Sequence, residues 1–267
     1  MTNANLSGVA DTLFIPLAAR AEISQRFPEY FFDERAVALK DLAAVREIAG
    51  KSSEYSMMAS VARQRTMDDI VRAFLARRGR SSIVNLGVGL ETMSSRLAAQ
   101  NAHFYELDFL EVIERRRALL GEAENETLIG ADMLDLSWTN RIDAVSPVML
   151  VVSGVFQYFE PEAVLGFIGG LRQAFPDSEL VFDATNSDGI KYARRYVEKT
   201  GNTAALMHFF IDDAQEFARD AGVELLEVRG FFDEARAMLG RRVGLYTRIA
   251  MRVADGKKRT LVVRIGL

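Results

Sequence analysis

The chain has 267 residues, of which 49% are hydrophobic and 26% are charged, and its formal net charge is −4. These values are ordinary for a soluble enzyme with a full core, and the negative charge argues against a nucleic-acid partner. The absence of cysteine excludes disulfides, thiolate nucleophiles and cysteine metal sites. With only two histidines, we also expect no metal site and no Ser-His-Asp triad.

No apolar run of the sequence reaches the roughly 18–20 residues that a bilayer-spanning helix needs. The first residues also lack the basic-then-apolar pattern of a signal peptide. We therefore expect a cytoplasmic protein with no membrane partner.

The first third of the chain has a helical pattern without a convincing strand. Residues 1–10 are small and polar, and we expect them to be frayed. Apolar residues recur at helical spacing from Val37 to Ile48, before a break at 50–53, and again from Met57 to Leu75, where Gly79 ends the run. The pattern predicts a helical cap or lid over residues 1–80.

From residue 81 onward, predicted strands and helices alternate, which is typical of an α/β fold with a parallel sheet. The run PVMLVV is apolar on both faces and predicts a central strand. The predicted strands are 82–87, 103–108, 126–131, 147–153, 179–184, 223–232 and 260–267, the last two paired antiparallel at one edge. The predicted helices are 91–100, 109–120, 161–175, 190–208 and 212–221, the last with Asp212 as its N-cap and Gly222 beyond its end.

We thus predict one compact domain with a doubly wound, mostly parallel seven-stranded sheet, its core spanning residues 81–267. Two basic clusters, at 77–78 and 115–117, are expected to be solvated helix ends. The sequence predicts no particular oligomeric state.

A glycine turn follows the first predicted strand, with Gly87 and Gly89 leading into a helix. Asp108 ends the second strand, about 20 residues later, where a carboxylate receives the ribose hydroxyls of an adenosine-bearing cofactor. A dinucleotide site would need a small residue where Thr92 stands, and Glu91 would repel a diphosphate. The turn therefore favours S-adenosylmethionine, with a nicotinamide oxidoreductase as the alternative.

Several blocks of the sequence, in order, resemble the leucine carboxyl methyltransferase family, within it the bacterial enzymes similar to tetracenomycin-type polyketide carboxyl O-methyltransferases. The blocks are DTLFIPLAARAEIS and FPEYFFDERAV (within 11–37), ARQRTMDDIVRAFL (62–75), NLGVGLETMSSRL (85–97), FYELDFLEVIERRRALL (104–120), GADMLDLSW (130–138), SGVFQYFEPEAV (153–164) and ELVFDA (179–184).

This resemblance implies a class I methyltransferase (Rossmann-like) fold, S-adenosylmethionine as the methyl donor, S-adenosylhomocysteine as its product, and a carboxylate as the usual acceptor. It also implies roles for individual residues. The matching positions are Arg63 for the methionine carboxylate, Gly87 and Gly89 for the turn beneath it, Asp108 for the ribose, and Asp132 with Met133 for the adenine.

The sequence departs from the family pattern at two places. The turn continues with Glu91 where the family usually has aspartate. The fourth strand of many relatives ends in Ala-Glu-Gly, with the glutamate close to the cofactor's amino group, whereas this chain has Ser153 there. We expect either weaker cofactor binding or compensation by another acid, with Glu91 and Glu106 as candidates.

A carboxylate acceptor is ionised at neutral pH and needs no general base, whereas a phenol or alcohol would need one, such as His208 or Asp183. An anionic acceptor does need a cation or hydrogen-bond donors. The candidates are Arg20 as first choice, Tyr30, Tyr158 and the arginines at 194–195.

The predicted function is an S-adenosylmethionine-dependent O-methyltransferase that esterifies the carboxylate of a small, partly apolar, polyketide-like metabolite. One alternative is a methyltransferase for the C-terminal carboxylate of a protein. Another, suggested by Ser153, is a catalytically silent protein that only binds the cofactor.

Overall fold

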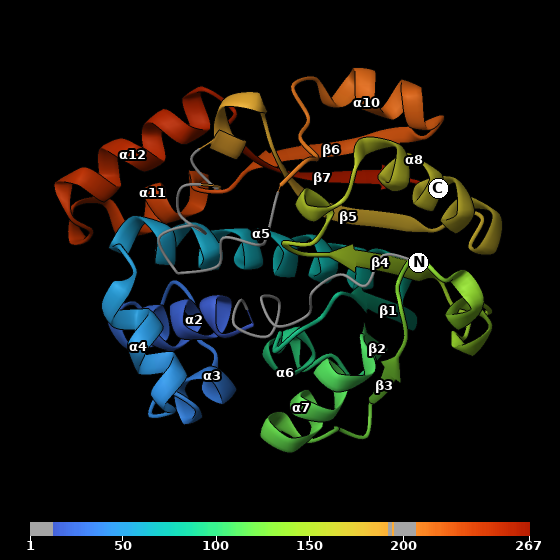
Figure 1. The fold of residues 1–267 in the computed structure, drawn as a ribbon, viewed down its shortest axis with the longest axis horizontal. Coiled ribbons are helices and arrows are strands. Elements are labelled where there is room, and N and C mark those ends of the chain that lie inside the picture. The colour runs from blue at the N-terminus through green and yellow to red at the C-terminus, as the bar shows by residue number, and fades with distance from the viewer. Residues whose placement is uncertain (1–12, 192–193, 195–206) are drawn as a thin grey trace.

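The computed structural model describes residues 13–191, 194 and 207–267. Its centre is a seven-stranded sheet in the order β3-β2-β1-β4-β5-β7-β6 (Figure 1). Strands β1 to β5 run parallel to their neighbours, and β7 runs antiparallel to both β5 and β6. The strands are β1 (Ser81–Leu86), β2 (Ala102–Asp108), β3 (Glu126–Gly130), β4 (Val148–Val152), β5 (Glu179–Thr185), β6 (Glu224–Gly230) and β7 (Thr260–Gly266). Each predicted strand is confirmed to within two residues at either end.

The helices of the described residues agree less closely with the sequence pattern. They are α2 (Phe14–Arg26), α3 (Glu34–Ala38), α4 (Ala43–Lys51), α5 (Glu54–Arg78), α6 (Met93–Leu97), α7 (Leu110–Leu120), α8 (Pro161–Ala174), α10 (Ala214–Ala221), α11 (Asp233–Leu239) and α12 (Leu245–Gly256). The apolar spacing of 37–48 is divided between α3 and α4, the helix predicted at 91–100 is the short α6, and the sequence pattern missed α11 and α12. Most of the helix predicted at 190–208 lies outside the described residues.

Helix α5 shows how local sequence sets the limits of an element. The Ser53 side chain accepts a hydrogen bond from the backbone N–H of Ser56, and Gly79, with φ +73°, ends the helix. At α10 the predicted N-cap was wrong by one residue. Asp213 accepts from the backbone of residues 215 and 216, while Asp212 accepts from the N–H of Ser187.

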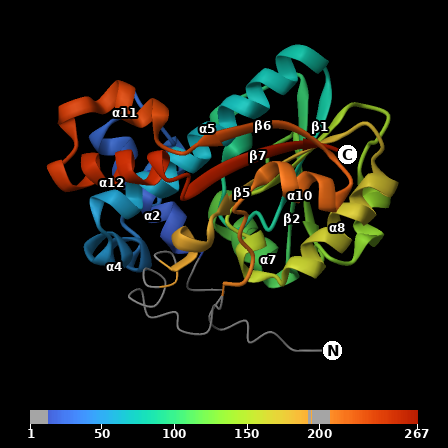
Figure 2. The same cartoon turned by 90° about the horizontal axis from the view of Figure 1, so that it is seen from above.

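Two hydrophobic cores cover the two faces of the sheet. Because side chains alternate along a strand, Ile83 packs toward α5 whereas Leu86 packs toward α8. Figure 2 shows α5 on one side of the strands and α8 with α10 on the other. Both faces are therefore buried, as the apolar run of β4 predicted.

The helices α2, α4, α11 and α12 gather at one end of the molecule (Figures 1 and 2). Residues of α11 and α12 share a core with α5, so the C-terminal part of the chain also contributes to this helical end. The division at residue 80 into a cap and a core stays a prediction. Among the described residues, no helix is both long and apolar enough to cross a membrane.

Candidate cofactor site

The candidate residues of four strands form one row across the sheet. Leu86 of β1 pairs with Leu107 of β2 and Val152 of β4, and Val152 pairs with Phe182 of β5. The next residue on each strand belongs to the row, which therefore consists of Gly87, Asp108, Ser153 and Asp183. Because Leu86 faces α8, the row that follows it faces α5. In parallel α/β sheets, ligands bind at this carboxyl edge.

The glycine turn is tied to the end of β2. Gly87 and Gly89 have φ values of +67° and +52°, a conformation that residues with a side chain rarely adopt. The backbone N–H of Gly89 donates to Oδ2 of Asp108 over 2.8 Å, and the N–H of Phe109 donates to Oδ1 over 2.8 Å. Burial raises the pKa of Asp108. The carboxylate is thereby fixed beside the turn, as the expected ribose contact requires.

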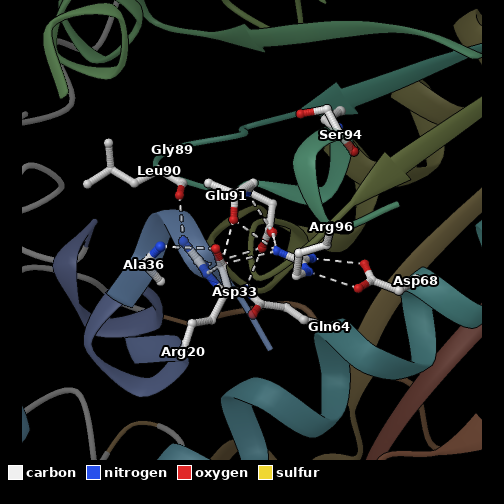
Figure 3. A network of polar contacts seen from close by, with 12 residues as sticks. Arg20, Asp33, Ala36, Gln64, Asp68, Gly89, Leu90, Glu91, Ser94 and Arg96 are labelled. Atoms are coloured by element: carbon white, nitrogen blue, oxygen red, sulfur yellow. Dashed lines mark hydrogen bonds and ion pairs between the residues drawn. The ribbon is translucent and has the colours of Figure 1, made fainter. Parts of the chain in front are cut away.

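A buried ionic cluster lies behind the turn and consists of Arg20, Asp33, Asp68, Glu91 and Arg96 (Figure 3). Arg96 binds both carboxylate oxygens of Asp68 at 2.8 Å and also contacts Glu91. Arg20 donates to Asp33 over 2.7 Å and reaches Glu91 at 3.4 Å. Three carboxylates from three separate segments are thus gathered around two arginines.

This cluster bears on two of the sequence predictions. Although burial favours the neutral acid, Arg96 and Arg20 lower the pKa of Glu91 to about 2. Glu91 is therefore a paired anion within the protein, not a charge offered to the cofactor. Arg20 is 1% exposed, and its guanidinium is shared between Asp33, Glu91 and the carbonyl of Leu90. These intramolecular partners engage Arg20 in the ionic cluster, and its expected acceptor role stays a prediction.

A second buried arginine, Arg116 of α7, holds the turn from the other side. It donates to the backbone carbonyls of Gly89, over 3.4 Å, and of Glu91. Together with Arg20 on Leu90, this gives three consecutive carbonyls of the turn a buried guanidinium partner. The expectation that 115–117 is a solvated helix end is wrong for Arg116, which faces the core between exposed neighbours.

Arg116 also lies near two buried acids, Glu106 of β2 and Glu126 of β3. It lies 3.8 Å from Glu106 and 3.9 Å from Glu126. Glu106 is 0% exposed, and Asn85 donates to it over 3.0 Å. Burial raises the pKa of Glu106 to about 7, despite the nearby Arg116. Because Glu106 sits two residues before Asp108 inside the sheet, it is not placed to compensate for Ser153.

Arg63 of α5 reaches the row at the end of β4 and β5. Its Nη1 donates to Oδ2 of Asp183 over 3.1 Å, while the N–H of Gly154 donates to Oδ1 over 2.5 Å. A Cβ on Gly154 would lie 2.7 Å from Nη1 of Arg63, so the guanidinium lies directly against this glycine. The Oγ of Ser153 and the Nε of Arg63 are buried and have no hydrogen-bond partner among the described residues. Arg63, Ser153, Gly154 and Asp183 form a charged cradle at this edge, and the cradle keeps unused hydrogen-bonding capacity.

The predicted adenine-framing pair lies at the same edge, after β3. Oδ1 of Asp132 accepts from the N–H of Leu134 over 2.9 Å, and its side chain is exposed. Met133 is buried, and its carbonyl accepts the indole N–H of Trp138 over 3.0 Å. The pair therefore offers one polar and one apolar side chain, and its contact with adenine stays a prediction.

Two acceptor candidates lie close to the row. Tyr158 follows β4, and burial raises its pKa, an effect that Asp183 adds to and that a hydrogen bond with Gln157 and the charge of Arg63 reduce. Nδ1 of His208 lies 2.9 Å from Glu160, two residues beyond this tyrosine. Both side chains thus belong to the edge at which the cradle opens.

The remaining acceptor candidates are Tyr30, in the core, and Arg194 with Arg195, of which Arg194 contacts Met207. Tyr30 is 1% exposed in the core against α5, where burial raises its pKa and Arg65 lies 5.3 Å from its ring. Its hydroxyl has no hydrogen-bond partner among the described residues, and its expected acceptor role stays a prediction. Arg194 donates to the carbonyl of Met207 over 3.1 Å, and Arg195 lies outside the described residues.

The sequence profile of the leucine carboxyl methyltransferase family matches residues 9–171. The chain belongs to this family. It is therefore an S-adenosylmethionine-dependent methyltransferase, as the resemblance implied, and the oxidoreductase alternative is discarded. The matched range includes the glycine turn, Asp108 and Ser153 but ends before Asp183.

Individual relatives are more distant. The human tRNA wybutosine-synthesizing protein 4 is 26% identical over an alignment that covers 45% of this chain and 23% of that protein, so the chain spans under a quarter of its length. A structure from Thermobifida fusca, described as a methyltransferase, shares 20% identity over 93% of both chains with a TM-score of 0.58. A DUF574 family protein from Streptomyces avermitilis shares 16% identity over 93% of this chain and 96% of its own, with a TM-score of 0.59. These two structures have the fold of this leucine carboxyl methyltransferase family member.

Replacing Arg96 by methionine should destabilise the protein by about 3–5 kcal/mol, because it removes the cluster arginine that pairs with the buried carboxylate of Asp68. The matched control is Arg72→Met on α5, where an exposed pair with Asp69 is worth less than about 1 kcal/mol. Urea unfolding of both variants measures the difference. Equal losses of unfolding free energy in the two variants would show that the buried cluster contributes no more to stability than the exposed pair.

The raised pKa of Glu106 predicts a pH dependence of stability. The folded state holds a proton that the unfolded state releases between pH 4.5 and about 7, so stability falls as the pH rises through this window. The difference in unfolding free energy between wild type and Glu106→Gln should therefore fall by on the order of 3 kcal/mol as the pH rises from 4.5 to about 7. Parallel pH profiles of unfolding free energy for wild type and Glu106→Gln would contradict this prediction. Glu111→Gln, at an exposed position, is the control and should follow the wild-type profile.

Proposed function

We propose that the row and the turn hold S-adenosylmethionine. Gly87 and Gly89 would lie against the cofactor, Asp108 would bind its ribose, and Asp132 with Met133 would frame its adenine. Arg63 would pair with its carboxylate. The support for this fit is the unpartnered Oγ of Ser153 and Nε of Arg63 among the described residues, at the place where polar groups of a ligand would enter.

The bound cofactor supplies a methyl group that its sulfonium has already activated. The protein therefore has to hold the acceptor in line with that methyl group and keep water away. A carboxylate suits such a site, because it is ionised at neutral pH and gives up no proton during the transfer. On this proposal His208, at the rim beside Glu160, is not required as a base.

We infer that the acceptor is the carboxylate of a small, partly apolar metabolite, of polyketide-like character. The observation that carries this is the position of Tyr158, which packs with Ile190 and Met207 and lies in the field of the Arg63–Asp183 pair. An apolar wall next to a charged cradle fits an acid with an apolar body. The hydroxyl of Tyr158 would donate a hydrogen bond to the acceptor carboxylate.

The C-terminal carboxylate of a protein is the second candidate, because the family is named for methylation of a leucine carboxyl group. The apolar wall favours the small acid over a solvated protein tail. A tRNA acceptor, to which the name of the human relative points, is disfavoured by the net charge of −4.

The acceptor class is tested by methyl transfer from labelled S-adenosylmethionine to aryl and alkyl carboxylic acids, their matching alcohols and amides, and a peptide ending in leucine. We expect label on the small acids, recovered as volatile methanol after alkaline hydrolysis, because esters are cleaved there and ethers are not. Stable label on alcohols would contradict the carboxylate assignment. Label confined to the peptide would establish the second candidate instead.

A further inference from the structure

The amino-acid end of S-adenosylmethionine carries both a carboxylate and an ammonium group at neutral pH. A charge that enters a protein edge and loses water must be paired there, or the binding energy is lost. On the proposed function, Arg63 pairs the carboxylate. At the end of β4, where the family resemblance implies the contact with the ammonium group, this chain has Ser153, whose hydroxyl accepts a hydrogen bond but carries no charge.

An acid stands at the same level of the next strand. Asp183 of β5 is one residue beyond the pair formed by Val152 and Phe182, as Ser153 is on β4. Adjacent strands lie about 4.8 Å apart, so the carboxylate is displaced by a single strand spacing from position 153. The hydrogen bond of 2.5 Å from the Gly154 N–H to Asp183 confirms this closeness. Asp183 is 7% exposed, so its charge acts with little screening by water.

Other acids near the row are excluded by their positions. Glu91 is paired with Arg20 and Arg96, and Glu106 lies below the row inside the sheet. Asp108 ends β2, which is two strands away from β4 in the sheet order.

We propose that Asp183 supplies the anionic contact for the ammonium group of the cofactor, with Ser153 as its neutral neighbour. The Arg63–Asp183 pair, joined at 3.1 Å, presents a cation and an anion side by side. The cofactor carboxylate would face Arg63 and its ammonium group would face Asp183. Positive and negative charges would therefore alternate around the site when the cofactor is bound. The two protein charges neutralise each other beforehand, so neither is left buried alone in the absence of ligand. This inference rests on the proposed cofactor site.

The test compares three ligands by calorimetric titration: S-adenosylhomocysteine, its analogue without the amino group, and its analogue without the carboxylate. Asp183→Asn should weaken binding of S-adenosylhomocysteine and of the decarboxy analogue by about tenfold or more, because a charge-assisted hydrogen bond is lost. The analogue without the amino group should change by less than about threefold, within the spread expected for a neutral contact. The exposed Asp143→Asn, before β4, is the matched control.

Equal weakening of all three ligands would overturn the proposal, since Asp183 would then act only by holding Arg63 and Gly154. Unchanged binding of S-adenosylhomocysteine would overturn it as well. Should Asp183→Asn fold poorly, Asp183→Ser is titrated in its place, with the same expected selective loss for the two amino-bearing ligands. Failure of wild type to bind S-adenosylhomocysteine at all would instead refute the proposed cofactor site.

Discussion

The glycine turn after β1 depends on buried charge for its position. Gly87 and Gly89 give the backbone its left-handed conformation, but they have no side chains with which to anchor it. The anchoring comes from guanidinium groups, since the carbonyls of residues 89, 90 and 91 accept hydrogen bonds from Arg116 and Arg20. The N–H of Gly89 is held in turn by Asp108. The turn, the end of β2 and the helix α2 are therefore one connected unit.

Buried ion pairs of this kind add little net stability, because desolvation offsets most of the attraction between the charges. What they do provide is a defined geometry, since Arg20 and Arg96 each bind more than one carboxylate of the cluster. The ionic cluster draws Arg20 and Asp33 from the N-terminal helical region, Asp68 from α5, and Glu91 with Arg96 from the turn and α6. We interpret the cluster as the device that couples the packing of the N-terminal helices to the shape of the candidate cofactor site.

The sheet was predictable because its strands are short apolar runs bounded by turn residues, and the carboxyl-edge positions of Asp108 and Ser153 followed from those limits. Side-chain partners were less predictable. The local sequence around Arg20 gives no sign that the residue is buried. In the structure its guanidinium binds Asp33, thirteen residues later, and Glu91. Arg116 does carry a signal, because Val112 and Ile113 precede it by one helical turn on the buried face of α7. The position of Asp183 beside Ser153 follows from the register of β4 and β5, and no local sequence pattern encodes that register.

We propose that this edge of the sheet binds S-adenosylmethionine through the Asp108 carboxylate, which the glycine turn holds in place. Calorimetric titration of S-adenosylhomocysteine into ligand-free wild type and Asp108→Asn tests it most directly, with Asp220→Asn on α10 as the control. We predict saturable one-to-one binding by wild type and the control, and at least about tenfold weaker binding by Asp108→Asn, because its charged hydrogen bonds are lost. An unchanged dissociation constant for Asp108→Asn, or no binding by wild type, would contradict the account.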